Sequence, residues 1–356
     1  MSVIAESLWS ASDTSPEAIE QALREMLFQQ HAAEPDSVPA RVLNLVAVVD
    51  REWSGEIANR LRKVGRYQPS RTIVCQVDPG RQTIDAQVSV AVQDGSTLSL
   101  ARELVIVDIG THHLEHLETI VDPLVVTDIP TLVWSPHGHD EAVDALLAIS
   151  QIALIDTVDA FTPQEGLARA AALVERAIVV DLAWLRSVPW RERIAALFDP
   201  PSERPSLERL SHITIRHEET SSVVALLLVG WLGSRLGWTP SPLMLDREGR
   251  LTGSVHARRQ EVRITLQPVP LPVRGLAGLT LETADGTSIA LDRDRGGLAA
   301  VRIDQGAFGA GPTEHRWTIM GASRGEGGIL GEGIRQAMLR DPVYRPALTA
   351  AQGLIA

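Results

Sequence analysis

Four aspartates follow apolar runs that the sequence predicts to be buried strands: Asp50, Asp78, Asp108 and Asp156. The carboxyl ends of parallel strands are where α/β proteins build their active sites. A carboxylate placed there could act as a general base or a metal ligand. Aspartate is also a favoured residue in the turn and cap that start a helix. Since no nucleophile, base or ligand set accompanies these four residues in the sequence, capping is the interpretation favoured over catalysis.

Two short segments carry histidines at spacings that could suit a metal. "THHLEH" places His112 and His116 four residues apart, and "SPHGHD" adds His137 and His139. On an α-helix, residues four apart share a face, and two imidazoles with a third ligand could hold zinc. The glutamate that a metalloprotease helix carries after its first histidine is missing. We therefore expect no metal site and read the first segment as the exposed start of a helix.

The segment "RYQPSRTIVCQVDPG" places Ser70 and Arg71 directly before a predicted buried strand. An arginine at the start of a strand could bind a phosphate group through its guanidinium. It could also contact another protein, or hold a neighbouring loop through a salt bridge. The sequence leaves these three roles open, with the loop anchor as the favoured one.

Motifs for nucleotide binding or covalent catalysis are incomplete. Lys63 is the only lysine and lies near the end of a predicted amphipathic helix, where a basic residue is favourable for dipole reasons alone. "FGAGPTEH" has Gly309 and Gly311 but lacks the third glycine of a dinucleotide fingerprint. "GEGGILGEG" has the wrong spacing, although its amides could bind an anion. We expect no catalytic residue and no cofactor site.

Tryptophan is unusually frequent, with eight residues against two tyrosines. Trp and Arg are the residue types that most often anchor protein–protein contacts, although most tryptophans are simply part of a core. The segment "DLAWLRSVPWRERIAALFD" holds two tryptophans and three arginines. We name four of these residues as candidates for a partner interface or a structural motif: Trp184, Arg186, Trp190 and Arg191.

The composition is that of a globular protein, with 44% hydrophobic and 22% charged residues among 356. The net charge of −12 argues against general nucleic-acid binding. No apolar run reaches the roughly 20 residues of a membrane span, and the first residues lack the pattern of a secretory signal. Cys75 is the only cysteine, which excludes an internal disulfide. We expect a cytoplasmic protein that binds neither nucleic acid nor membranes.

Strand and helix patterns alternate in the first half of the chain. We expect a helix and linker over residues 1–40 and an α/β domain over 41–180, in which a mostly parallel sheet is flanked by helices. Apolar runs such as "RVLNLVAVVD" indicate strands covered on both faces. A hairpin over 83–107 should extend one edge of this sheet.

The pattern changes after a connecting segment at 181–206, where Pro189 is expected to open a helix over 190–198. Residues 207–356 predict an α+β domain: an antiparallel sheet with helices on one face. "DREGR", "ADGT" and "DRGG" are turn signals between its short strands, and "SSVVALLLVGWLGSRLG" is an apolar helix.

Several segments together resemble the OpcA family, the glucose-6-phosphate dehydrogenase assembly proteins. These are "RVLNLVAVVD", "QPSRTIV", "DIPTLVW", "IALIDTVDAF", "DLAWLRSVPWRERIAALFD", "WLGSRLGW" and "RDPVYRPAL", which extend from about residue 41 to about 348. The resemblance implies a non-catalytic partner of the dehydrogenase of the oxidative pentose phosphate pathway, one that promotes its active oligomer and raises its activity. Ser70 and Arg71 match the Pro-Ser-Arg element of the family.

One departure concerns redox control. Cyanobacterial members of the family are thought to respond to redox state through cysteines, and Cys75 alone cannot form an internal thiol switch. The alternative function is a sugar-phosphate-binding protein or enzyme that uses the carboxyl ends of the strands in the first domain.

Overall fold

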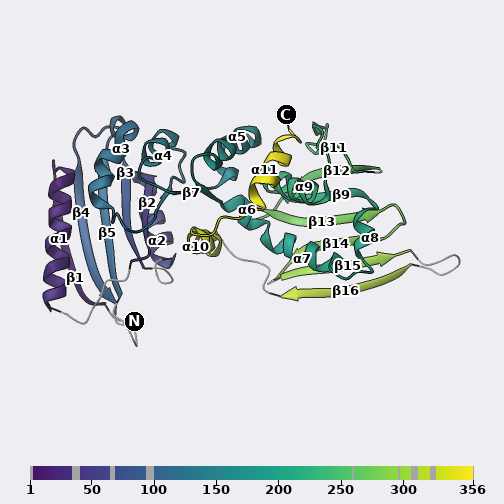
Figure 1. Ribbon diagram of the computed structural model, residues 1–356, viewed down its shortest axis with the longest axis horizontal. Helices are drawn as coiled ribbons and strands as arrows, with labels where there is room; N and C mark the ends of the chain where they lie inside the picture. Colours follow the sequence, from purple (N-terminus) through teal and green to yellow (C-terminus); the bar gives the residue numbers. More distant parts are fainter. Residues whose placement is uncertain are drawn as a thin grey trace. The chain divides into compact units, whose positions relative to one another are not determined.

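The computed structural model describes residues 3–33, 41–64, 69–93, 100–258, 260–295, 297–305, 312–320 and 326–355. The chain forms two compact units that interleave in sequence. The first unit comprises Met1–Ile155, Glu175–Val180 and Leu330–Arg340, and the second comprises Asp156–Val174, Asp181–Ile329 and Asp341–Ala356. Figure 1 shows each unit built on its own sheet.

The first unit is an α/β body around an eight-stranded sheet of order β1-β4-β5-β3-β2-β6-β7-β8. Its strands are β1 Val3–Ala11, β2 Leu43–Asp50, β3 Ser70–Val77, β4 Asp85–Gln93, β5 Leu100–Ile109, β6 Thr131–Trp134, β7 Ile152–Ile155 and β8 Ile178–Asp181. Its α-helices are α1 Pro16–Ala33, α2 Ser54–Val64, α3 Leu117–Val121 and α4 Asp140–Leu146.

The centre of this sheet is parallel, as the alternation of strands and helices predicts. Strand β2 pairs in parallel with both β3 and β6, and β3 pairs in parallel with β5. Every residue of β2 before Asp50 is buried, because helices cover both faces of a parallel sheet. The β4–β5 hairpin is antiparallel and extends one edge, as expected. The predicted turn at 94–99 lies outside the described residues.

Two features of the first unit differ from the prediction. Residues 1–40 were expected to be a helix and a linker, but β1 forms the edge strand beyond β4 and pairs with it antiparallel. The histidine segment is also not a single α-helix. Thr111–His116 is a 3₁₀ helix followed by the short α3. Because a 3₁₀ helix has three residues per turn, His112 and His116 do not share the face that an α-helix would give them.

The second unit is an α+β body around a second eight-stranded sheet, of order β10-β11-β12-β9-β13-β14-β15-β16. Its strands are β9 Leu210–Glu218, β10 Met244–Leu245, β11 Leu251–His256, β12 Glu261–Val269, β13 Leu276–Thr283, β14 Ser288–Asp294, β15 Gly297–Asp304 and β16 Thr313–Met320. Its α-helices are α5 Pro163–Val174, α6 Leu182–Arg186, α7 Val188–Phe198, α8 Arg204–Leu207, α9 Ser222–Leu236 and α11 Tyr344–Gln352, and α10 Glu326–Gln336 is divided between the units.

This sheet is antiparallel except for one pair, since β9 and β12 run parallel. The parallel pair was not predicted; it arises because α9 and the β10–β11 strands separate β9 from β12 in the sequence. The "ADGT" and "DRGG" turns connect β13 to β14 and β14 to β15, as their turn chemistry predicts. Helix α7 begins at Val188 with Pro189 in its first turn.

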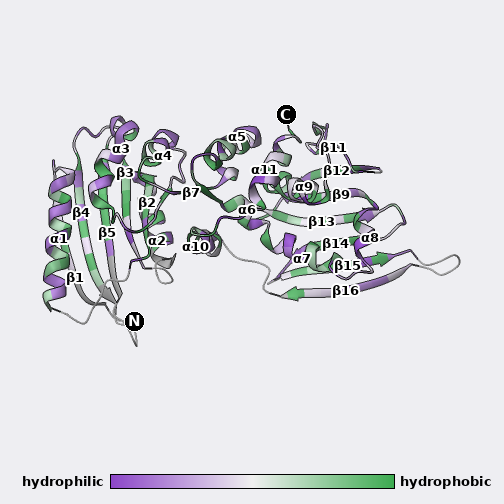
Figure 2. Cartoon of the chain, in the orientation of Figure 1, coloured by the Kyte–Doolittle hydropathy of each residue, from purple (hydrophilic) through white to green (hydrophobic). Residues whose placement is uncertain are grey.

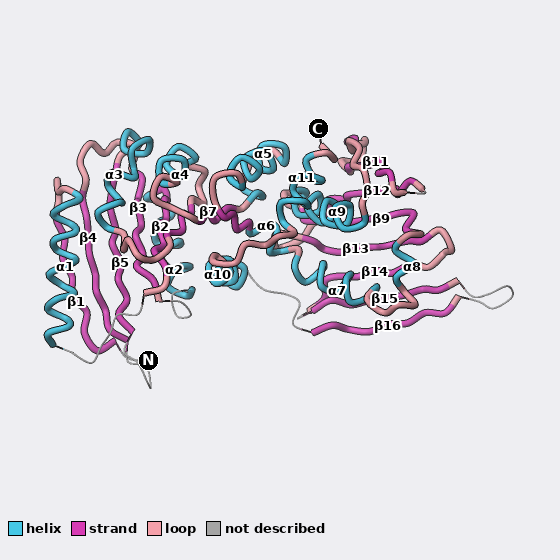
Figure 3. The backbone as a smooth tube through the Cα atoms, in the orientation of Figure 1, coloured by secondary structure: helices cyan, strands magenta, loops and turns pink. Residues whose placement is uncertain are grey.

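Helices pack on these sheets through apolar faces. Hydrophobic and hydrophilic positions intermix along α1, which contacts β4 and buries Ile19, Leu23 and Met26 (Figure 2). Helix α9 is buried along most of its length between β9 and α11, and Figure 3 shows it over the second sheet. Such a helix is apolar all round because neighbours surround it. Within the described part of the chain, no helix is both long and apolar enough to span a membrane.

Candidate functional site

The first place to look for a ligand site is the point where the strand order of the first sheet reverses. In doubly wound sheets, ligands bind at such a switch point, outside the carboxyl ends of the strands. Here it lies between β2 and β6, because the chain goes from β2 to β3 on one side and returns to β6 on the other. Asp50 ends β2, and the segment after β6 carries His137 and His139.

Side chains of the protein itself meet at this switch point. The backbone N–H of Asp50 donates to Nδ1 of His137 at 2.9 Å. Nε2 of His139 lies 2.8 Å from Oδ1 of Asp50. The contact with the backbone N–H requires His137 to be unprotonated at Nδ1. The two histidines thus connect the strand ends of β2 and β6. Among the described residues, no group of three or more His, Cys, Asp or Glu side chains is arranged so that it could hold a metal ion.

The first β–α turn also lacks the shape of a dinucleotide cradle. After β2 the chain runs through Arg51–Trp53, a 3₁₀ turn, where a nucleotide fold would need glycines so that the backbone can approach a pyrophosphate. The side chain of Trp53 is about half exposed here. The segment with Gly309 lies outside the described residues.

The remaining strand ends of the first sheet form an ion-pair cluster. Nη1 of Arg51 lies 3.7 Å from Asp78 and 3.5 Å from Asp108. Arg81 pairs with Asp85 at 2.5 Å. Burial raises the pKa of Asp108, and the Arg51 and Arg81 charges partly offset this effect. Each of these carboxylates thus lies within 4 Å of an arginine of the same unit.

Arg71 lies at the amino-terminal ends of the parallel strands, at the start of β3, with only 8% of its surface exposed. Its Nε donates to Oε2 of Glu103 at 2.7 Å, and its Nη1 donates to the carbonyl of Leu124 at 2.8 Å. Arg41 also pairs with Glu103. Ser70, beside it, is half-buried, with its hydroxyl 3.4 Å from Thr72. The geometry fits the loop-anchor role among the three that the sequence left open.

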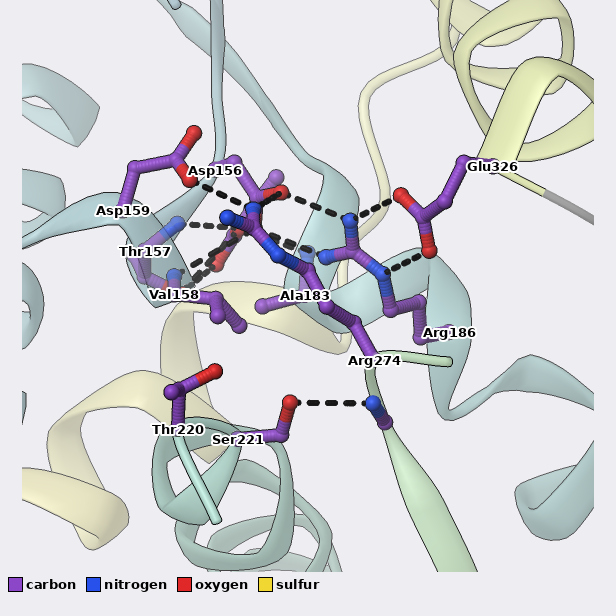
Figure 4. A network of polar contacts seen from close by, with 12 residues as sticks. Asp156, Thr157, Val158, Asp159, Ala183, Arg186, Thr220, Ser221, Arg274 and Glu326 are labelled. Atoms are coloured by element: carbon purple, nitrogen blue, oxygen red, sulfur yellow. Dashed lines mark hydrogen bonds and ion pairs between the residues drawn. The ribbon is translucent and has the colours of Figure 1, made fainter. Parts of the chain in front are cut away.

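The second unit contains the most elaborate polar network (Figure 4). Arg186, at the end of α6, has a side chain that is 3% exposed. Its Nη1 and Nη2 donate to the two oxygens of Asp156, both at 2.7 Å. Nη2 and Nε donate to Glu326 at 2.6 and 3.1 Å. Arg274 adds a second cation beside Asp156, at 3.4 Å, and also pairs with Asp159 at 2.5 Å.

The charges of this network stabilise one another. Burial disfavours the charged guanidinium of Arg186, but the hydrogen bonds that it donates to Asp156 and Glu326 outweigh burial and raise its pKa. Burial and the nearby Asp156 charge raise the pKa of Asp159, against the effect of Arg274. A guanidinium that uses its planar fork in this way on two carboxylates has few free donors for a substrate.

Asp181 forms a second buried polar centre, at the start of α6. It accepts hydrogen bonds from the backbone N–H of Thr157 at 3.2 Å and of Ala183 at 3.0 Å, and from the hydroxyl of Tyr344 at 2.9 Å. Burial and the nearby charge of Asp156 raise the pKa of Asp181 to about 6, although its hydrogen-bond donors favour the ionised form. Burial and Asp181 raise the pKa of Tyr344 as well.

The candidate tryptophans and Arg191 lie inside the second unit. Trp184 and Trp190 are 3% and 1% exposed. The indole N–H of Trp184 donates to Asp341 at 2.7 Å, and the guanidinium of Arg191 lies 3.5 Å from the centre of its ring. Burial lowers the pKa of Arg191 to about 10. In this structure, Trp184, Trp190 and Arg191 contribute to internal packing of the second unit, and Arg186 belongs to the polar network with Asp156 and Glu326.

The sequence missed the partners that make these contacts. Glu103, Glu326, Asp341 and Tyr344 are far from Arg71, Arg186 and Trp184 along the chain, and no local motif marks them. The one local signal was that Asp156 and Asp181 each follow an apolar run. In the structure, both aspartates cap the start of a helix, where they accept hydrogen bonds from the backbone N–H groups of Val158 and Ala183.

Comparisons with known proteins give a consistent result. Residues 62–172 match the family model described as the N-terminal domain of a glucose-6-phosphate dehydrogenase subunit, and residues 177–348 match the C-terminal domain of the same subunit. A Synechocystis sp. protein named as an OxPP cycle protein OpcA is 32% identical over 131 residues, 36% of this chain and 28% of that protein. Its Nostoc punctiforme counterpart is 30% identical over 165 residues, 44% of this chain and 35% of that protein. The aligned part thus spans about a third of these relatives' length.

Among solved structures, the fold is similar to that of glucose-6-phosphate 1-dehydrogenase from Mycobacterium avium. The TM-score is 0.57 at 10% sequence identity, over 89% of this chain and 91% of the dehydrogenase chain. At this identity the likeness concerns the fold alone.

Proposed function

We propose that this chain, which belongs to the OpcA family of glucose-6-phosphate dehydrogenase subunits, is a non-catalytic partner that binds glucose-6-phosphate dehydrogenase and promotes its active oligomer. The observation that carries the proposal is that side chains of the protein itself occupy the switch point of the first sheet. This chain has a fold similar to that of the dehydrogenase, but Asp50, His137 and His139 contact one another at the position where a doubly wound sheet binds a ligand. The match to both domains of a dehydrogenase subunit family supports the choice of partner.

The mechanism is a shift of population. A partner that binds the active oligomer better than the inactive form stabilises the active oligomer by the difference in binding free energy. A tenfold change in apparent substrate affinity needs about 1.4 kcal/mol of differential binding. The chain supplies this free energy through surface contacts, with no cofactor and no reaction of its own. We place the process in the cytoplasm, in keeping with the single cysteine.

The alternative, a sugar-phosphate-binding protein, has less support from the geometry. Arg71, which could have bound a phosphate, donates its hydrogen bonds to Glu103 and to the carbonyl of Leu124. It also lies at the start of β3, whereas the alternative places the ligand at the carboxyl ends of the strands. The arginines at the carboxyl ends, Arg51 and Arg81, pair with aspartates. A phosphate would have to displace these carboxylates.

The test measures the dehydrogenase rate against glucose 6-phosphate with and without the purified chain. We expect a lower apparent KM or a higher kcat, and a shift of the dehydrogenase to a larger species in sedimentation. Heat-unfolded chain serves as the control for nonspecific protein effects. Calorimetry of the chain alone with NADP and with glucose 6-phosphate should show no binding. Tight binding of either compound, with an unaffected dehydrogenase, would favour the alternative.

A further inference from the structure

One face of the second sheet has no covering element among the described residues of its unit. Burial alternates along the strands. In β9, Ile213 and Ile215 are fully buried on the side of α9, while Thr214 and Arg216 point to the other side and are half-buried. The strands β12, β13 and β14 continue this alternation. We call this second side the bare face.

The pairing register shows how the bare face is built. A central row of small and β-branched residues crosses six strands from β11 to β15: Thr252, Thr265, Thr214, Thr280, Ala290 and Val301. Beside this row, Arg216 pairs with Asp292 at 2.9 Å, and its guanidinium lies against Gly278. A Cβ at position 278 would come within 2.5 Å of both side chains, so glycine allows the pair to lie flat on the sheet. The central row from β11 to β15 is therefore a strip of short side chains.

The dimensions of this face suit a protein partner. Strands lie about 4.8 Å apart and rise about 3.3 Å per residue, so six strands of about eight residues offer roughly 750 Å². A stable protein–protein interface buries about 800 Å² on each partner. Sheets of similar twist pack face to face through their side chains, which requires a partner that presents a sheet of the same curvature.

The charges of the bare face are of both signs and largely pair with one another. His212 on β9 lies 3.1 Å from Glu282 on β13, Arg216 on β9 pairs with Asp292 on β14 at 2.9 Å, and Arg316 pairs with Glu314 on β16. The geometry of the sheet, rather than its charge, thus favours a partner of the same fold.

We propose that the bare face is the surface on which this chain binds a glucose-6-phosphate dehydrogenase subunit, sheet against sheet; the identity of this partner rests on the proposed function. The dehydrogenase has the required geometry, since its shared fold covers 91% of the enzyme chain and thus includes a counterpart of the second sheet. The chain takes the position of a dehydrogenase subunit in the assembly without contributing an active site.

The test compares two variants with the same chemical change. Ala290→Arg places a long cation in the central row of the bare face, whereas Ala196→Arg places it on an exposed position of α7. Binding to purified dehydrogenase is measured by biolayer interferometry and activation by the rate assay. We expect Ala290→Arg to weaken binding at least about tenfold, as burying an unpaired charge in an interface does. Ala196→Arg should bind like the wild type.

The possible outcomes distinguish a wrong docking surface from a wrong proposed function. If the wild type binds and Ala290→Arg binds equally well, the bare face is not the docking surface, although the proposed function stands. If the wild type does not bind or activate the dehydrogenase, both proposals fail. If the chain alone is a dimer in sedimentation and Ala290→Arg makes it monomeric, the face belongs to a second copy and the dehydrogenase assignment is overturned.

A charge reversal covers the case in which Ala290→Arg does not fold. Arg263 and Glu282 are exposed on the bare face, so Arg263→Glu and Glu282→Arg leave the core intact. We expect each to slow association with the dehydrogenase several-fold at low salt, with the difference lost at high salt. Unchanged association rates for both variants would contradict the proposal.

Discussion

The guanidinium of Arg186 donates two parallel hydrogen bonds to the carboxylate of Asp156, each 2.7 Å long. Asp156 follows β7 and Arg186 ends α6, so this pair holds together two segments that are 30 residues apart. Glu326 completes the coordination from the start of α10. A residue that the sequence offered as an interface anchor therefore has an internal role in this structure.

Removal of Arg186 should destabilise the second unit strongly. Arg186→Ala leaves the carboxylate of Asp156 buried with only Arg274 nearby, and breaking a buried pair costs about 3–5 kcal/mol. Urea unfolding monitored by circular dichroism gives the free energy of unfolding. The control is Arg204→Ala, whose side chain is 63% exposed and should matter by less than about 1 kcal/mol. Equal effects of the two variants would contradict the structural role of the network.

Asp181 should make stability depend on pH in an unusual direction. Its folded pKa of about 6 is above the unfolded value of about 3.9, so the folded state binds the proton more tightly. The contribution of this group to stability is therefore highest at low pH and is lost as the pH rises from about 4 to about 6. The loss amounts to at most about 3 kcal/mol.

The Asp181→Asn variant isolates this effect, because the amide cannot titrate and its oxygen can still accept from Thr157 and Ala183. We expect the wild type to lose stability relative to Asp181→Asn between pH 4 and pH 6.5, measured by urea unfolding in matched buffers. Parallel stability curves for the two proteins would show that Asp181 is ionised in the folded state across this range.

Gly230 should be intolerant of a methyl group. A Cβ at this position of α9 would lie 2.2 Å from the carbonyl oxygen of Ala347 and 2.8 Å from the N atom of Ala351, so α9 and α11 would have to separate. Overpacking of this kind costs about 1–3 kcal/mol. Gly55→Ala in α2 is the matched control, since its Cβ would meet nothing within 4 Å and alanine favours helix by about 1 kcal/mol. Thermal unfolding should therefore shift in opposite directions.

Arg71 should be needed for stability of the first unit and for no ligand. Arg71→Ala leaves the buried carboxylate of Glu103 with Arg41 as its remaining partner and removes the donor to the carbonyl of Leu124. We expect a loss of about 2–4 kcal/mol in urea unfolding. Arg60→Ala, which removes an exposed pair with Glu56, should cost less than about 0.5 kcal/mol. A folded Arg71→Ala variant that has lost measurable binding of glucose 6-phosphate would contradict this assignment.

The sequence determined the features that depend on neighbouring residues. Thr162 and Glu165, three residues apart at the start of α5, form a capping box with both hydrogen bonds at 3.2 Å. The turn residues of "ADGT" and "DRGG" fixed two hairpins, and the uninterrupted apolar run of β2 indicated a strand covered on both faces. The resemblance to the OpcA family could also be recognised from the sequence, because the short segments typical of the family occur in the same order along the chain.

Tertiary structure decided everything that depends on distant pairing. The strand β1 forms only because β4 is available beside it, and the parallel pairing of β9 with β12 follows from the path of the chain between them. Arg71 and Arg186 were recognisable as candidates, but their acceptors are 30 to 140 residues away. The bare face became visible only once alternating residues from six strands lay in register. Local propensity reaches a few residues along the chain, whereas burial and ion pairing depend on which segments the fold brings together.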